Sequence, residues 1–313
     1  MKKTLILASF AALMASSAMA TTVGVSMAVF DDNFLTVLRN GIQADAKKMG
    51  ATVQVEDAKN DMAKQLDQVK NFIASGVDAI IVNPVDTSAT QAISDAAAAA
   101  KVPLVYVNRQ PINVDSLPPT QAFVASNEVD SGTLETTEIC KLLKAEGKTT
   151  ASVYVMEGQL SNQAAVQRTK DIHDVISGPN CGVKITIIDQ QTANWSRADA
   201  QNLMTNWLST NKPFDAVIAN NDEMAIGAIQ ALKAGGIDMK KMIVGGIDAT
   251  QDGLAAMQAG DLKVTVFQNA AGQGAGALET AIKLSKGEKV DQKVYVPFEL
   301  VTPANMDKYM KKN

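Results

Sequence analysis

Short apolar runs alternate with amphipathic stretches along the first third of the chain. Apolar residues recur at helical spacing from Phe34 to Ile42, and Gly50 ends that pattern. Residues 79–82 are Ala-Ile-Ile-Val, with no polar position, which is typical of a strand buried on both faces of a parallel sheet. The alternation predicts strands at residues 22–27, 52–56, 79–82 and 103–107. Helices between such strands indicate a doubly wound α/β unit.

The same alternation restarts after a proline-rich loop at residues 111–120. It predicts strands at residues 151–156, 183–189, 214–219, 242–247 and 263–267, and a last β stretch at 293–301. It predicts helices at residues 130–143, 163–176, 198–208, 223–232, 253–259 and 274–285. The expected fold class is therefore α/β, with two doubly wound parallel-sheet lobes. Such sheets bind ligands at the carboxyl ends of their strands, so two lobes form a natural cleft.

Residues 1–20 have the three parts of a secretory signal peptide. Lys2 and Lys3 give a positive start, residues 4–15 are largely apolar, and Ala18-Met19-Ala20 is a small-x-small cleavage site. We expect the mature chain to begin at Thr21 and to reside in the periplasm. The alternative is a short membrane anchor, but this apolar core is too short to cross a bilayer comfortably.

Composition narrows the classes of function. The chain has 313 residues, which suggests about two domains, and its 46% hydrophobic and 20% charged residues are ordinary for a globular protein. The formal charge is −4, and no basic face is evident. These features argue against a nucleic acid as a partner.

The two cysteines, Cys140 and Cys181, fall in the same predicted lobe. In an oxidising compartment an isolated pair tends to form a disulfide, and two buried thiols are the alternative. Together with His173, the only histidine, they do not make a metal site. We interpret His173, in the middle of a predicted helix, as a packing or surface residue, and we expect no metal and no cofactor.

Polar and aromatic side chains follow several predicted strands at their carboxyl ends. Because each hydroxyl of a polyol donates and accepts, it pairs with carboxylates, amides and arginine, and aromatic rings cover its C–H faces. This set therefore predicts a small polyhydroxylated ligand, a sugar or cyclitol. The candidate residues are Phe30, Asp32, Phe34, Asn108, Arg109, Trp195, Asn221, Asp248 and Gln268.

Each candidate also has a structural interpretation. Asp32 and its neighbours suit a helix N-cap, and Asp248 could cap the helix that follows it. Phe34 and Trp195 could pack in a core. Two further acidic residues at a predicted helix start, Asp222 and Glu223, suit the helix dipole and are interpreted as structural.

Several motifs resemble the ribose/galactose type of periplasmic binding proteins, over essentially the whole mature chain. They are Asn83-Pro-Val-Asp86, Asn108-Arg109, residues 221–228, residues 244–250 and Gln268. Within that group, residues 30–36, residues 191–195 and His173-Asp174 are most similar to inositol or rhizopine binders.

The resemblance implies the type I periplasmic binding protein fold, in which two lobes joined by a three-segment hinge close over the ligand. It places the crossovers near residues 126–127, 268–269 and 297–298. The N-terminal lobe would comprise residues 21–126 and 269–297. The C-terminal lobe would comprise residues 127–268 and 298–313.

The resemblance also implies ligand positions, carried over one by one. In the first lobe they are Asp32, Phe34, Leu35, Asn108 and Arg109; in the second they are Val166, Trp195, Asn221 and Asp248, with Gln268 at the hinge. Val166 departs from an arginine that the family often has, and Arg168 is expected to be rotated away by two helical positions. Phe30 is expected to supply the stacking surface that Leu35 lacks. These departures weigh against ribose, and myo-inositol is the expected ligand.

Partners follow from the same resemblance. The protein is expected to serve the membrane subunits of an ABC importer, with a chemoreceptor as a further partner, and to be a monomer. A sugar-responsive transcription factor would need a helix-turn-helix before residue 20, where the signal peptide stands.

A sugar-acting enzyme is the remaining class. Asp32 and Asp248 could act as a glycosidase acid and base, but the chain has no nucleophile–histidine set, and we expect no enzyme activity. Residues 272–277 have the spacing of a dinucleotide fingerprint, but they come late in the chain. We interpret these glycines as close helix packing.

Overall fold

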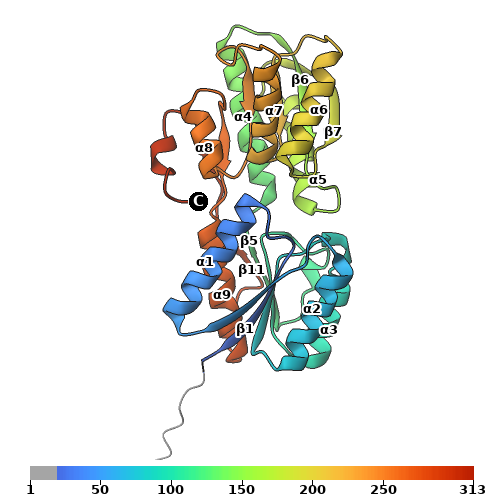
Figure 1. The fold of residues 1–313 in the computed structure, drawn as a ribbon, viewed down its shortest axis with the longest axis vertical. Helices are drawn as coiled ribbons and strands as arrows, with labels where there is room; N and C mark the ends of the chain where they lie inside the picture. Colours follow the sequence, from blue (N-terminus) through green and yellow to red (C-terminus); the bar gives the residue numbers. More distant parts are fainter. Residues whose placement is uncertain (1–19) are drawn as a thin grey trace, which may run out of the picture.

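The computed structural model describes residues 20–313. Two parallel sheets, each with helices on both faces, lie one above the other along the long axis of the molecule (Figure 1). The predicted signal peptide and most of its cleavage site fall at residues 1–19, outside the described residues. None of the described helices is long and apolar enough to cross a membrane.

The first sheet has six parallel strands in the order β11-β5-β4-β3-β1-β2. Their bounds are β1 Thr22–Met27, β2 Thr52–Asp57, β3 Ala79–Val82, β4 Leu104–Val107, β5 Gln121–Ala125 and β11 Lys293–Tyr295. Helices α1 (Asn33–Met49) and α9 (Ala270–Ser285) cover one face, and α2 (Met62–Ser75) and α3 (Gln91–Ala100) cover the other.

Burial on both faces explains why β3 has no polar residue. Successive side chains of a strand point to opposite faces. Ile81 packs with Leu38 of α1, and its neighbour Ile80 packs with Phe72 of α2. The glycines at residues 272–277 lie within α9, where a Cβ on Gly274 would come within 3.1 Å of the Leu38 carbonyl oxygen of α1. They therefore permit close helix packing.

The second sheet has four parallel strands in the order β7-β6-β8-β9. The strands are β6 Thr150–Glu157, β7 Lys184–Thr192, β8 Ala216–Ala219 and β9 Ile243–Gly245. Its helices are α4 Glu128–Ala145, α5 Gln163–Ser177, α6 Arg197–Ser209, α7 Asp222–Ala234 and α8 Gln251–Gln258. The α/β class and the doubly wound parallel sheets predicted from the sequence are confirmed.

Three chain segments connect the two sheets, and one of them corrects a prediction. The β stretch expected at residues 293–301 is two strands in different sheets: β11 belongs to the first sheet, and β12 (Glu299–Val301) pairs antiparallel with β10 (Thr265–Phe267). Pro297 lies between them, and proline has no N–H with which to continue a ladder. The other two segments join β5 to α4 and β10 to α9.

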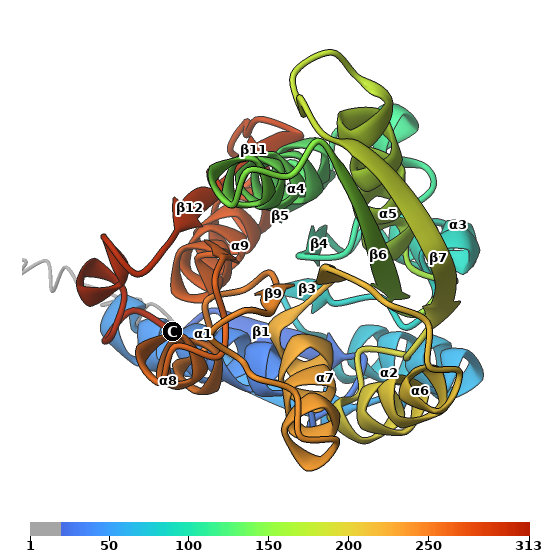
Figure 2. The ribbon, with the colours of Figure 1, turned by 90° about the horizontal axis from the view of Figure 1, so that it is seen from above.

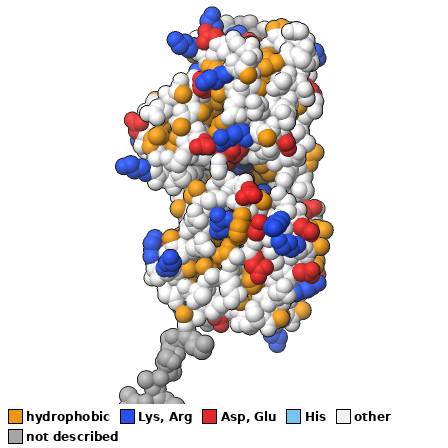
Figure 3. Space-filling view, viewed as in Figure 1, with side chains coloured by type: hydrophobic (Ala, Val, Ile, Leu, Met, Phe, Trp, Pro, Cys, Tyr) orange, Lys and Arg blue, Asp and Glu red, His pale blue; other side chains and the backbone are white. Residues whose placement is uncertain are grey.

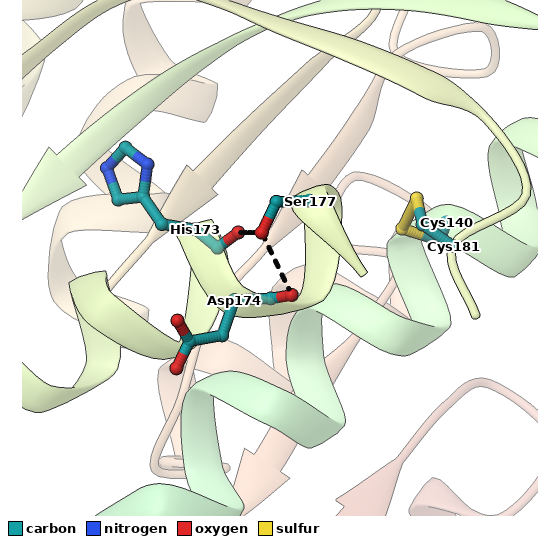
Figure 4. The surroundings of a disulfide bond; sticks show 5 residues. All are labelled: Cys140, His173, Asp174, Ser177 and Cys181. Carbon is teal, nitrogen blue, oxygen red and sulfur yellow. Dashed lines mark hydrogen bonds between the residues drawn. A yellow bond between two sulfur atoms is a disulfide. The ribbon is translucent and has the colours of Figure 1, made fainter. Parts of the chain in front are cut away.

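A disulfide joins Cys140 of α4 to Cys181, which follows α5 (Figure 4). The sulfur atoms are 2.07 Å apart, and the two Cα atoms 5.1 Å. His173 of α5 points away from this bond, and its Nε2 lies 2.7 Å from Oε1 of Gln190 on β7. Among residues 20–313 no cluster of three His, Cys, Asp or Glu side chains is placed to hold a metal ion.

Candidate functional site

The carboxyl ends of strands from both sheets meet at a cavity of about 390 Å³, counting the part that is open to solvent. Every candidate residue predicted from the sequence lines it, with the exception of Phe30. Strand ends converge because all strands within each main sheet run parallel. The cavity also contains residues that the candidate set omitted: Leu35, Glu128, Asn162, Ala164 and Arg168.

Three of the residues that line the cavity have a left-handed backbone, which is uncommon outside glycine. The φ angles are 65° at Asn108, 63° at Trp195 and 122° at Asp248. Asp248 is fixed in this conformation by its own N–H, which donates to the Val266 carbonyl at 2.8 Å, and by Asn313, whose Nδ2 donates to the Asp248 carbonyl at 2.8 Å. Such strain persists only where surrounding contacts hold it, and it concentrates at ligand sites.

Arg168 corrects the expectation for α5. Val166, expected at the ligand position, is 53% exposed on the outside of the helix, whereas Arg168 is buried and lines the cavity. Two helical positions rotate a side chain by about 200°. Because of that rotation, the Val166 side chain faces solvent and the Arg168 side chain faces the cavity. The expectation was the reverse. An arginine of α5 therefore does line the cavity.

Four acceptors surround the Arg168 guanidinium. Its Nε donates to Oε2 of Glu128 at 2.7 Å, its Nη2 to Oε1 of Glu128 at 3.2 Å, and its Nη1 to the Asn220 carbonyl at 2.7 Å. Its Nη2 also donates to Oε1 of Gln268 at 3.3 Å. Burial opposes the charge, but Glu128 and Asp248 outweigh it and raise the pKa of Arg168.

The carboxyl group of Asp248 accepts no recorded hydrogen bond from the described residues. Within residues 20–313, the nearest recorded cation is Nη1 of Arg168, 3.9 Å from Oδ1. Burial raises the pKa of Asp248 well above its ordinary range, the Arg168 charge opposes that shift, and Asp222, Asp32 and Glu128 add to it. Thr250 caps α8 by accepting from the Gly253 N–H at 3.1 Å, so that helix does not use Asp248 as its cap.

Arg109 and Asp32 form the charged part of the first lobe's wall. Arg109 is buried and donates from Nη1 to the Pro84 carbonyl at 3.0 Å. Burial lowers the pKa of Arg109 to about 10, partly offset by Asp32, so the group stays cationic at neutral pH. Asp32 accepts from the Leu35 N–H at 2.8 Å as the α1 cap, and burial raises its pKa. Asp32 thus combines the capping position with a place in the cavity wall.

The amide side chains differ in how much binding capacity they retain. Asn108 accepts from Asn83 Nδ2 at 3.1 Å and donates to Gln273 Oε1 at 3.3 Å, so protein groups already occupy much of it. Asn221 caps α7 through Oδ1, which accepts from the Met224 N–H at 3.0 Å. Nε2 of Gln268 is buried and makes no hydrogen bond to the described residues. A buried donor of this kind requires a partner.

The aromatic candidates separate into two groups. Trp195 lines the cavity, with its Nε1 donating to Asn162 Oδ1 at 3.0 Å, and Phe34 lines it from the first turn of α1. Phe30 does not reach the cavity: it packs against the core below α1, with the Arg39 guanidinium 4.1 Å from its ring centroid. The stacking role expected of Phe30 is therefore wrong. Phe30 lies two residues before Asp32, the N-cap of α1, and is therefore not part of that helix.

Comparison with known proteins decides the family. The chain matches the periplasmic binding protein domain over residues 23–289. It belongs to this family. A Rhizobium meliloti protein whose name refers to rhizopine binding is 60% identical over the full length of both chains. The ribose import binding protein of Bacillus subtilis is 32% identical over 90% of this chain and 87% of its own.

The same result comes from solved structures. An ABC transporter solute-binding protein from Bacillus halodurans, crystallised with bound myo-inositol, superposes with a TM-score of 0.86. It is 38% identical, and the match covers 94% of this chain and 98% of that one. These relatives are binding proteins, and this periplasmic binding protein is likewise not an enzyme.

In this binding protein, the part of the chain around the first sheet is hydrogen-bonded directly to the part around the second sheet, beside the cavity. The Thr87 N–H donates to the Ser161 carbonyl at 3.1 Å, and Thr87 Oγ1 accepts from the Gln163 N–H at 3.0 Å. Asn162 donates from Nδ2 to the Val85 carbonyl at 3.1 Å while it accepts from Trp195. Glu128 and Asn162 were not found from the sequence, although Glu128 follows a crossover and lies in the first turn of α4.

Proposed function

We propose that this chain is the periplasmic substrate-binding component of an ABC importer, and that it binds a sugar or cyclitol, with myo-inositol as the preferred ligand. The observation that carries the proposal is the cavity itself. Oppositely charged and amide groups that follow strands of two separate sheets converge on one cavity, and Asp248 and Gln268 retain unused hydrogen-bonding capacity there.

The chemistry of the wall suits a polyol. Ring hydroxyls can donate to the Asp248 and Asp32 carboxylates, and such charge-assisted bonds are about twice as strong as neutral ones. They can accept from Gln268 Nε2 and from the guanidinium of Arg109. Trp195 and Phe34 provide apolar surface for the C–H face of a ring.

The choice of myo-inositol rests on the relatives. The solved Bacillus halodurans structure contains myo-inositol, and the Rhizobium meliloti relative is named for rhizopine. The sequence argument from a missing arginine no longer supports this choice, because Arg168 lines the cavity. Ribose is the second candidate, since ribose import proteins are 32% identical.

Closure would proceed by rotation of two lobes about the three connecting segments. We propose lobes of residues 21–126 with 269–297, and of residues 127–268 with 298–313. A ligand that contacts both lobes binds the closed form better than the open form, which is the condition for shifting the equilibrium. The bonds from Thr87 and Asn162 to the opposite lobe would then form only on closure.

The remaining partners follow the same proposal. After export and removal of residues 1–20, the closed protein would dock as a monomer on the importer's membrane subunits. A chemoreceptor is a further candidate for reading the closed form. Neither role needs a cofactor.

A ligand panel tests the proposal. Calorimetry of the exported protein with myo-inositol, ribose, other pentoses and hexoses should give a dissociation constant of about 1 μM or lower for myo-inositol, or roughly 8 kcal/mol. A Trp207→Phe variant leaves Trp195 as the only tryptophan, so its fluorescence reports binding at the cavity wall. Tighter binding of ribose than of myo-inositol would overturn the choice of ligand, and no binding of any polyol would overturn the function.

A further inference from the structure

A second hollow adjoins the ligand cavity and opens beside it. We call it the outer pocket; it is bordered by Asp31, Asn33, Gln159, Asn194, Arg197 and Glu223. Asp32, Arg109 and Trp195 line both the outer pocket and the cavity, so the two spaces are adjacent and share these side chains. Counting the part open to solvent, the outer pocket has about 940 Å³ of space against about 390 Å³ for the cavity.

The two lobes contact each other at two sides of the cavity. Viewed along the long axis, α5 lies over α3 at one side, and α6 and α7 lie over α2 and α1 at another (Figure 2). At the first side the lobes touch directly through Thr87 and Asn162. At the second side the hydrogen bond from Asn33 Nδ2 to Glu223 Oε1, 2.8 Å long, crosses the edge of the outer pocket. Hydrogen bonds therefore join the lobes at both sides, and the outer pocket lies beside the bond at the second side.

The outer pocket offers polar groups that the fold does not use. Within residues 20–313, the side chains of Asp31 and Gln159 take part in no recorded hydrogen bond. Asp31 is exposed and belongs to the first lobe, whereas Gln159 is partly buried and belongs to the second. A group that extended from the ring could bond to both lobes, and it would add to the stability of the closed form.

The charge of the outer pocket restricts what that group can be. Arg197 is bonded to Glu223 at 2.9 Å and to Asp252 at 2.6 Å, so its charge is already matched by two carboxylates. Asp31 and Asp32 add two more carboxylic groups, against the single guanidinium of Arg109. On the face of the molecule shown in Figure 3, side chains of both charges lie at the narrowing between the lobes. An anionic group would meet an excess of carboxylates here.

We propose that the outer pocket is a subsite for a hydrophilic group without negative charge, linked to the bound ring through an oxygen atom. The protein would then take substituted polyols, up to the size of a second sugar ring, as readily as the bare ring. This inference rests on the proposed function, because the ring must occupy the cavity.

Calorimetry with substituted inositols tests the subsite. The probes are myo-inositol, the set of its mono-O-galactosyl regioisomers, and the set of its monophosphates. At least one uncharged substituted inositol should bind as tightly as myo-inositol or more tightly, and every monophosphate should bind at least 30-fold more weakly, on the order of 2 kcal/mol. The subsite is refuted if every uncharged substituted inositol binds more weakly than myo-inositol, or if a monophosphate binds as well.

A matched pair of variants separates the outer pocket from the cavity. Gln159→Ala should weaken the best substituted ligand at least threefold and leave the affinity for myo-inositol unchanged. Gln110→Ala, a glutamine at the opposite side of the lobe boundary, should change neither affinity. Equal losses for both ligands in Gln159→Ala, or no loss, would count against the subsite. If myo-inositol and every other polyol fail to bind the unaltered protein, it is the proposed function that fails.

Discussion

Nη1 of Arg168 lies 3.9 Å from Oδ1 of Asp248, close enough for charge attraction and too far for a hydrogen bond. Nε and Nη2 of Arg168 both donate to the Glu128 carboxylate, and these two bonds fix the position of the guanidinium. The Asp248 carboxylate therefore faces the cavity without a full partner. In the proposed complex, ligand hydroxyls complete its hydrogen bonding.

Asp248→Asn should weaken myo-inositol binding by about 10- to 150-fold, because a hydrogen bond to a charged group contributes roughly 1.5–3 kcal/mol. Asparagine keeps the shape of the side chain, so the fold should be retained. Calorimetry gives the affinity. Asp261→Asn is the control: this carboxylate pairs with Lys233 far from the cavity residues and should leave binding unchanged. Equal affinity in Asp248→Asn and the unaltered protein would remove Asp248 from the site.

Phe34 and Phe30 make a second matched pair. Phe34→Leu should lower the affinity for myo-inositol about tenfold, because Phe34 lines the cavity and its ring covers apolar C–H surface. Phe30→Leu should change the affinity less than twofold, since Phe30 packs under Arg39 outside the cavity. Fluorescence titration of both variants, alongside their melting temperatures, distinguishes loss of contact from loss of fold. The opposite order of effects would restore the stacking role first expected of Phe30.

The disulfide should contribute to stability and leave binding intact. Cys140 and Cys181 are 41 residues apart, and closing a loop of that length stabilises the folded state by about 2–4 kcal/mol. The double variant Cys140→Ala, Cys181→Ala should lose that amount in urea unfolding and keep its affinity within twofold. Neither cysteine lines the cavity. A large loss of affinity in a folded double variant would contradict this separation.

Asp222 should make stability fall as pH rises. Burial raises the pKa of Asp222 from 3.8 to about 7, although Thr265 Oγ1 and the Thr250 N–H donate to its carboxylate. Between these values the folded state binds more protons than the unfolded state, so the free energy of unfolding decreases with pH across that window. The contribution is at most roughly 4 kcal/mol.

Urea unfolding between pH 4 and 7 measures this effect. Asp222→Asn removes the titrating group, so its stability should fall less steeply with pH than that of the unaltered protein, by up to about 1.4 kcal/mol per pH unit. The other buried carboxyl groups keep their own contributions in both proteins. Parallel pH curves for the two proteins would show that Asp222 does not titrate in this window.

Parallel strands made much of the site accessible from sequence. Residues directly after a buried strand must emerge at one edge of the sheet, which placed Arg109, Asn221 and Asp248 correctly at the cavity. Capping chemistry was equally local: Asp32 was recognisable as a helix start, and it also lines the cavity.

Rotation and long-range contact were not accessible in this way. Spacing along α5 gives the angle between Val166 and Arg168, but only packing decides which of them faces inward. Glu128 becomes part of the cavity through Arg168, 40 residues away. Asn313 fixes the Asp248 backbone from the far end of the chain, and no local pattern marks such a contact.

The crystal structure of residues 21–313 saturated with myo-inositol tests the central claim most directly. The account predicts one ring in the cavity between the two sheets, with hydroxyls bonded to Asp248 and Arg109 and a C–H face against Trp195 or Phe34. A ring bound elsewhere on the saturated protein, with the space between Arg109 and Asp248 free of ligand, would contradict it.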